Sequence, residues 1–175
     1  MIYIAYYLSP IGKLLLASDG IFLTGLWIEG QKYYLNVETD KLIQNDELAI
    51  FKKTKVWLDC YFNGDKVSST DLLIKLNGTS FQKEVWEILQ HIPYGTTTTY
   101  SAIAKEIAKR RGINQMSAQA VGNAVGHNPI SIIVPCHRVV GENGSLTGYA
   151  GGIDKKIKLL ELEKVNMKNL FVPKK

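Results

Sequence analysis

Hydrophobic residues follow two different spacings along the 175-residue chain, and this change constrains the fold more than any other feature. Residues 2–8, 13–17 and 21–28 are apolar runs separated by turn residues, a pattern typical of an antiparallel β-meander. From about residue 45 to 63 the apolar residues recur at helical spacing instead. This part of the chain therefore predicts an α/β domain in which a meander is followed by a helix. The inner face of that helix would carry Leu48, Phe51, Leu58 and Phe62.

The rest of the chain is mainly helical by the same criterion. Thr79 and Gln82 have the spacing of a capping box, and Pro93 ends the helix that they begin. Two shorter helices are expected over residues 100–109 and 118–127. Turn-rich residues separate the two patterns, which indicates an N-terminal domain over residues 1–78 and a C-terminal domain over residues 79–175.

The two shorter helices have the arrangement of a helix-turn-helix. A compact basic link, Arg110-Arg111-Gly112, joins them. The second helix is rich in small residues, which would let it lie close to a partner backbone: Ala118, Ala120, Gly122, Ala124 and Gly126. Composition alone leaves two partners open, DNA and a neighbouring helix.

The positive charge of the chain lies in its second half. The formal net charge is +5, but residues 1–78 carry 8 Lys and Arg against 9 Asp and Glu, whereas residues 79–175 carry 13 against 7. Such an excess forms either a solvated surface or a face that neutralises the phosphates of a nucleic acid.

Composition argues against several classes of protein. No apolar run approaches about 18 residues, so no membrane-spanning segment is expected. A basic leader is missing from the N-terminal residues, and two cysteines cannot form a disulfide framework, so a cytoplasmic location is expected. Three scattered histidines and no CxxC or HExxH motif predict neither a metal site nor a cofactor.

The residues best suited to catalysis are Cys136 and His137. They follow an apolar run, residues 130–134, that we interpret as a buried extended segment. A base and cationic neighbours would favour the reactive thiolate, and His137 and Arg138 come directly after the cysteine. Side chains of adjacent residues on a regular strand point to opposite faces, so the pair can act together only if Pro135 introduces a turn. A reactive pair and an inert buried cysteine are both compatible with the residues alone.

Longer strings around this pair resemble a known family. The strings NPISIIVPCHRVV and NGSLTGYAGG, together with the upstream FQKEVWEILQHIPYGTTTTYSAIA, are similar to the O6-alkylguanine-DNA alkyltransferases, also called methylated-DNA–protein-cysteine methyltransferases. The similarity is close over residues 79–165, and residues 1–78 resemble the family only in length and pattern. It implies an RNase H-like α/β N-terminal domain and a mainly α, winged-helix-like C-terminal domain that carries the helix-turn-helix.

The resemblance also implies a role for individual residues. Cys136 would accept the alkyl group, His137 would take its proton through a water, and Glu163 would orient His137. Asn128 would hold the turn that places the cysteine, and Tyr100 would contact the flipped base and favour protonation of the leaving guanine. The remaining implied contacts are with the base, through Val139, Tyr149, Ala150 and Gly151, and with DNA, through Ala118, Gln119, Gly122 and Arg138. Arg138 is also expected to make structural bonds.

Gln119 departs from the family pattern, because many members have an arginine there that fills the space left by the flipped nucleotide. Glutamine offers hydrogen bonds but no charge, which predicts weaker binding to duplex DNA.

The implied activity is direct-reversal DNA repair. A methyl or larger alkyl group would move irreversibly from O6-alkylguanine to Cys136 after base flipping, with O4-methylthymine as a second candidate substrate. The protein would act once, without a cofactor, as a monomer that binds double-stranded DNA through the minor groove. The alternatives are a non-catalytic alkyltransferase-like lesion-binding protein, a helix-turn-helix regulator and a Cys-His hydrolase.

Overall fold

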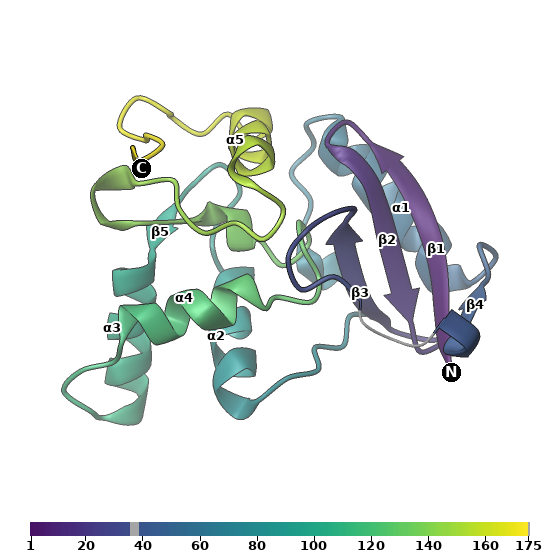
Figure 1. The fold of residues 1–175 in the computed structure, drawn as a ribbon, viewed down its shortest axis with the longest axis horizontal. Coiled ribbons are helices and arrows are strands. Elements are labelled where there is room, and N and C mark those ends of the chain that lie inside the picture. Colours follow the sequence, from purple (N-terminus) through teal and green to yellow (C-terminus); the bar gives the residue numbers. More distant parts are fainter. Residues whose placement is uncertain (36–38, 175) are drawn as a thin grey trace. The chain divides into compact units, whose positions relative to one another are not determined.

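The computed structural model describes residues 1–35 and 39–174. The chain forms two compact units (Figure 1). The first contains Met1–Asn77 together with Pro129–Ile133, and the second contains Gly78–Asn128 and Val134–Lys175. Our division at residue 78 had assigned the segment 129–133 to the second domain. None of the helices in the described ranges is long and apolar enough to span a lipid bilayer.

The first unit is built on a sheet whose strands lie in the order β3-β2-β1-β4. The antiparallel part is the meander predicted from the sequence, and its bounds are β1 (Ile2–Ser9), β2 (Gly12–Ser18) and β3 (Leu23–Ile28). β4 (Leu42–Gln44) pairs with β1 in parallel, which the sequence did not predict. A parallel partner must arrive through a crossover, so its position depends on tertiary packing rather than on a local turn.

Helix α1 (Ala49–Phe62) lies along one face of this sheet (Figure 1). Phe51 and Leu58 are buried, as the helical spacing predicted, whereas Leu48 and Phe62 are only half-buried. The true inner face also includes Thr54 and Tyr61. A separate cluster of Ile4, Leu15, Ala17 and Trp27 accompanies β1, β2 and β3. The inner strand β2 is buried from Leu14 to Ser18.

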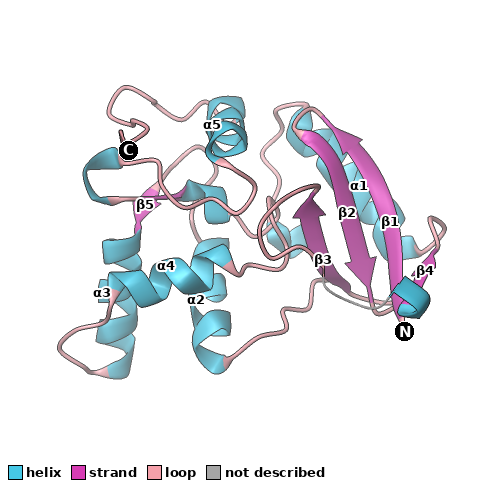
Figure 2. Cartoon of the chain, in the orientation of Figure 1, coloured by secondary structure: helices cyan, strands magenta, loops and turns pink. Residues whose placement is uncertain are grey.

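The second unit is mainly helical (Figure 2). Its first helix, α2 (Ser80–Gln90), begins at the predicted capping box, in which Thr79 and Gln82 exchange hydrogen bonds between side chain and backbone. The other helices are α3 (Tyr100–Arg111), α4 (Ala118–Gly126) and α5 (Ile153–Leu162). Two short strands, β5 (Thr98–Thr99) and β6 (Val139–Val140), pair in parallel between them.

The helices of this unit pack around side chains from α2 and α4. Trp86 is buried and its indole Nε1 donates to the carbonyl oxygen of Ala124 at 2.8 Å. The two helices also bury apolar side chains, which are Val85 and Leu89 on α2 and Val121 and Val125 on α4. This packing fixes α4, which leads directly to the segment that precedes Cys136.

Candidate active site

Cys136 lies in a turn rather than on a strand. Pro135 has φ −82° and ψ 65°, and the amide of Cys136 donates to the carbonyl oxygen of Val134 at 2.8 Å, which together define an inverse γ-turn. A 3₁₀ turn, Cys136–Arg138, follows at once. Residues 130–134 are buried as predicted, but they form turns instead of the extended segment that we expected, and Ile132 has a φ of 72°. Proline therefore does introduce the turn that frees Cys136 and His137 from opposite strand faces.

The carboxylate of Glu163 gathers the polar groups that follow the cysteine. Its Oε2 lies 2.5 Å from Nε2 of His137, and its Oε1 accepts from Nε of Arg138 at 2.8 Å and from the amide of Gly95 at 3.0 Å. Nη1 of Arg138 donates to the carbonyl oxygen of Ile92 at 2.7 Å. Glu163 is the C-terminal cap of α5, so the end of this helix delivers the carboxylate to His137.

Burial and charge set the protonation states of this group. Burial alone raises the pKa of Glu163, but the hydrogen bonds and charges of His137 and Arg138 outweigh it and hold that pKa well below its usual range. For His137 burial is the largest cause, and it lowers the pKa despite the neighbouring carboxylate. Glu163 is therefore ionised and His137 neutral near pH 7. In this state Nε2–H of His137 donates to the carboxylate, which leaves Nδ1 as the basic nitrogen.

Cys136 is 5% exposed, and burial raises the pKa of its thiol. The basic neighbours in the sequence favour the thiolate, but the resting thiol is neutral and needs a base. Three influences oppose the rise of the pKa, namely a hydrogen bond from the side chain of Asn128, the charge of Lys156 and nearby backbone amides. Nδ2 of Asn128 also donates to the carbonyl oxygen of Val134 at 2.8 Å, so this residue ties the turn to the sulfur.

The sequence analysis missed Lys156. Its side chain is fully buried, and its Nζ donates to the carbonyl oxygens of Val139 at 2.6 Å and Thr147 at 3.0 Å. Burial lowers the pKa of this lysine to about 8, against the opposing effect of Cys136. Helix α5 buries Lys156 together with Leu159 and Leu160. A signal was present in the sequence, because Lys156, Leu160 and Glu163 are spaced i, i+4, i+7 along one helical stripe.

Tyr100 is half-buried at the first position of α3, where Thr99 caps the helix. Its hydroxyl donates to the carbonyl oxygens of Thr147 at 3.1 Å and Gly148 at 3.4 Å. Burial, followed by the charge of Cys136, raises the pKa of this hydroxyl to about 12. Tyr100 therefore remains a hydrogen-bond donor throughout the physiological pH range. Tyr149, also buried, follows Gly148 in the same loop.

The residues assigned to DNA contact divide into two groups. Gln119 is exposed and Ala118 and Gly122 are half-buried on α4, and Gln119 borders a depression of about 480 Å³ with Phe81 and Asn123. Arg138 belongs to the interior instead, because its guanidinium is bound to Glu163 and to the carbonyl oxygen of Ile92. We therefore withdraw it as a DNA contact and keep only the structural bonds that were also expected of it.

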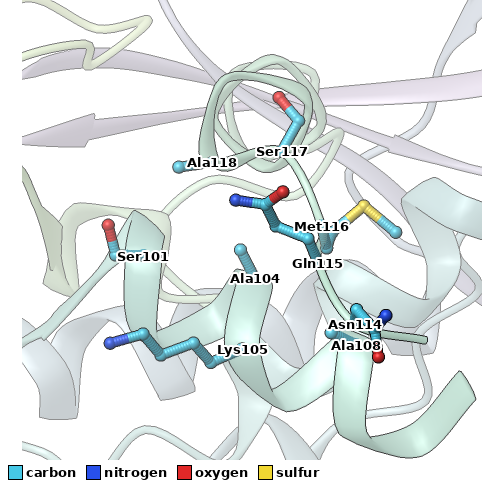
Figure 3. Close-up of a pocket in the computed structure, with 9 residues that line it drawn as sticks. All are labelled: Ser101, Ala104, Lys105, Ala108, Asn114, Gln115, Met116, Ser117 and Ala118. Carbon is cyan, nitrogen blue, oxygen red and sulfur yellow. The ribbon is translucent and has the colours of Figure 1, made fainter. Parts of the chain in front are cut away.

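A larger hollow of about 680 Å³ lies between α3 and the start of α4. Figure 3 shows Ser101 and Lys105 on α3 at one side, and Gln115 and Ser117 on the segment that leads into α4 at the other. The hydroxyl of Ser117 accepts from the amide of Ala120 at 3.1 Å and so begins the helix. In the part of the chain that the structure describes, no cluster of three or more His, Cys, Asp or Glu residues could hold a metal ion.

Comparisons with known families match both units. The model described as "6-O-methylguanine DNA methyltransferase, DNA binding domain" matches residues 80–165. The model described as "6-O-methylguanine DNA methyltransferase, ribonuclease-like domain" matches residues 2–76. Together they account for nearly the whole chain.

Individual relatives agree over similar lengths. The methylated-DNA–protein-cysteine methyltransferase of Haemophilus influenzae is 42% identical over 164 residues, which is 94% of this chain and 87% of the relative. The protein of that name from Methanosarcina acetivorans is 45% identical over 163 residues, covering 92% and 97%. Among solved structures, Mycobacterium tuberculosis OGT in complex with DNA has a TM-score of 0.79 at 42% identity, covering 93% of this chain and 92% of that one.

Proposed function

The chain belongs to the 6-O-methylguanine DNA methyltransferase family, and we propose that it repairs DNA by moving a methyl group from O6-methylguanine to the sulfur of Cys136. The observation that carries this proposal is the position of Cys136 in a proline-initiated turn, directly before a buried His137 that is bound to the carboxylate of Glu163. The arrangement offers a nucleophile, a base and a group that orients the base.

The chemistry begins with the removal of the thiol proton. Because burial raises the pKa of Cys136 and lowers that of His137, the resting pair is neutral, and the proton moves to Nδ1 of His137 through a water as the reaction starts. Glu163 stabilises the imidazolium that forms. Lys156 and Asn128 stabilise the thiolate, since both lower the pKa of Cys136.

The thiolate then attacks the methyl carbon. An S–C bond forms, the bond between that carbon and O6 breaks, and its electron pair stays with the guanine, which takes up a proton from water while the imidazolium of His137 returns its proton to solvent. Tyr100, whose hydroxyl remains protonated, turns its single O–H from the carbonyl oxygen of Thr147 to the leaving base and donates a hydrogen bond to it. Tyr149, Ala150 and Gly151 line the space beside O6, and the backbone of Val139 accepts from the exocyclic amine. The thioether at Cys136 is stable, so each molecule acts once.

The substrate is double-stranded DNA that bears O6-alkylguanine, bound through the minor groove by a helix-turn-helix made of α3 and α4. Ala118 and Gly122 allow a close approach, and Gln119 occupies the space of the extruded nucleotide. In this proposal the second unit is a winged-helix-like domain and the first an RNase H-like domain. The protein works as a cytoplasmic monomer, and O4-methylthymine is its second candidate substrate. A relative that bears the OGT name has been solved with DNA, which supports the choice of partner.

Mass spectrometry of the intact protein tests the proposal directly. After incubation with a duplex that contains one O6-methylguanine, the protein should gain the mass of one CH₂ group, and peptide mapping should place it on Cys136. Cys136→Ser should gain nothing, whereas Cys60→Ser should react like the unsubstituted protein, because Cys60 lies on α1 in the other unit. Lesion binding without any gain in mass would instead identify a non-catalytic lesion-binding protein.

A further inference from the structure

The loop between β6 and α5, residues 141–152, carries Tyr149, Ala150 and Gly151. The chain after α5 is bound to this loop. Lys164 adopts a left-handed φ of 59° and turns the chain back, and the amide of Val165 donates to the carbonyl oxygen of Leu160 at 3.0 Å. The amide of Leu146 then donates to the carbonyl oxygen of Phe171 at 2.8 Å, and the amide of Phe171 donates to the carbonyl oxygen of Gly144 at 3.1 Å. These bonds form a short parallel bridge between Ser145 and Phe171.

The fit between loop and tail is close at Gly144. This residue has a φ of +89°, and a Cβ atom built on it would lie 2.0 Å from the backbone oxygen of Asn169. Only glycine accepts both this left-handed φ and so close an approach of the tail backbone. Apolar contacts extend the junction, since Val165, Met167 and Leu170 pack against the buried cluster of Val140, Leu146 and Leu160. The tail as far as Leu170 is therefore part of the packed unit.

The other side of the loop reaches the reacting groups. One residue after Leu146, the carbonyl oxygen of Thr147 accepts from the hydroxyl of Tyr100 at 3.1 Å and from Nζ of Lys156 at 3.0 Å. The carbonyl oxygen of Gly148 lies 3.4 Å from the same hydroxyl. A loop anchored at Leu146 thus fixes the acceptor that orients both donors.

We propose that the segment Val165–Phe171 is a positioning element for the alkyl-transfer site: its backbone bonds to Gly144 and Leu146 hold the loop against Tyr100 and Lys156 and restrict the space beside the alkyl group. This inference rests on the proposed function. A displaced loop would misplace Tyr100 and Lys156 and admit larger groups beside Tyr149. Small displacements of reacting groups change rates strongly.

Two truncated variants distinguish the segment Val165–Phe171 from the residues that follow it. A variant that ends at Asn166 loses the bridge and the contacts of Met167 and Leu170, whereas a variant that ends at Phe171 retains every bond described above. Gly144→Ala keeps the full tail but forces it away from the loop. Its matched control is Gly64→Ala, because Gly64 has a similar φ of +94° and nothing within 4 Å of the added Cβ atom.

Single-turnover transfer is measured from duplexes that contain O6-methylguanine or O6-benzylguanine, together with the melting temperature of each variant. The Asn166-ending variant and Gly144→Ala should transfer methyl about tenfold more slowly than their controls. Their benzyl-to-methyl rate ratio should rise. Methyl and benzyl rates that match the controls, or that fall by equal factors together with the melting temperature, would overturn the inference.

A second readout does not depend on DNA. Labelling of Cys136 by iodoacetamide and by a bulkier N-benzyl analogue, located by peptide mapping, reports how closely the loop covers the sulfur. When the bridge is lost, the rate at which the bulky reagent labels Cys136 should rise by a larger factor than the rate for iodoacetamide. An unchanged ratio of the two labelling rates contradicts the inference. If the unsubstituted protein transfers no methyl group, the proposed function fails, while this labelling ratio still decides the role of the tail.

Discussion

Oε2 of Glu163 lies 2.5 Å from Nε2 of His137, and neither side chain is accessible to solvent. The second oxygen of the carboxylate binds Arg138 and the amide of Gly95. One carboxylate therefore joins α5, the turn after Cys136 and the turn before β5. Because the same group neutralises one cation and orients one base, its removal affects folding and chemistry together.

Glu163→Gln should slow methyl transfer by about 10²-fold, since the imidazolium loses its counter-charge. It should also lower the free energy of unfolding by about 3 kcal/mol, because the buried guanidinium of Arg138 is left without a charge partner. Single-turnover kinetics and urea unfolding measure the two effects. Glu161→Gln, an exposed change on the same helix, is the control and should alter neither quantity.

The pH dependence of transfer should report the lowered pKa of His137. A neutral imidazole is the base, so the rate should persist as the pH falls past 6.5, the ordinary pKa of histidine, and decline only at lower pH. Rapid-quench measurements from pH 5 to 8 check this. A half-maximal rate at pH 6.5 or above would contradict the assignment. His91→Gln, on a residue outside the site, should leave the profile unchanged.

Stability should fall with acid in a window set by Glu163. The folded pKa is depressed below the ordinary value of 4.5, so below pH 4.5 the unfolded chain binds more protons than the folded one. The stabilisation from Glu163 is thus complete above this pH and is lost as the pH falls through the folded pKa. Urea unfolding between pH 6 and 3 should show a steeper loss for the unsubstituted protein than for Glu163→Gln. Parallel curves would argue against the depressed pKa.

Lys156→Met should slow the reaction of Cys136 with iodoacetamide at pH 7, because the thiolate loses a buried cation that lowers the pKa of Cys136. It should also reduce the free energy of unfolding by about 1–3 kcal/mol, since the carbonyl oxygens of Val139 and Thr147 lose a donor. Lys158→Met removes the same charge from an exposed position of α5 and should have neither effect. Equal rates for the two variants would remove Lys156 from the thiolate's environment.

Gln119→Arg should tighten binding to duplex DNA, because a guanidinium adds charge and a planar donor where the flipped nucleotide leaves a space. Asn123→Arg is the matched control, since Asn123 lies one turn further along the same exposed face of α4. Fluorescence anisotropy at two salt concentrations measures the affinity of each variant for duplex DNA. An equal gain in affinity for both variants would mean that only the added charge matters. No gain for Gln119→Arg would show that Gln119 does not occupy the space of the flipped nucleotide.

Local signals predicted much of the fold. The capping box at Thr79, the proline after α2 and the apolar spacing located the helices to within a few residues, because each signal acts within one or two turns. The parallel strand β4 and the turns at residues 131–133 escaped prediction. Both depend on partners far away in the sequence, such as the bonds of Leu26 with Pro129 and Ser131.

The site was predicted unevenly for a similar reason. The motif identified Cys136, His137 and Glu163, and the structure brings His137 and Glu163 into contact. Lys156 was missed because a lysine is normally expected in solvent. Its burial is explained only by its two carbonyl partners, which the folded chain brings to it. The neutral resting thiol was missed because burial of a side chain is a property of the folded chain.

The two arginines that end α3, Arg110 and Arg111, are bonded to glutamates of α2 and α3. Arg110 contacts Glu87 and Glu106, and Arg111 contacts Glu84. Cations engaged in this way displace fewer counterions from a nucleic acid than their formal charge suggests. The logarithm of the association constant should therefore depend on the logarithm of salt concentration with a gentler slope than a count of lysines and arginines implies.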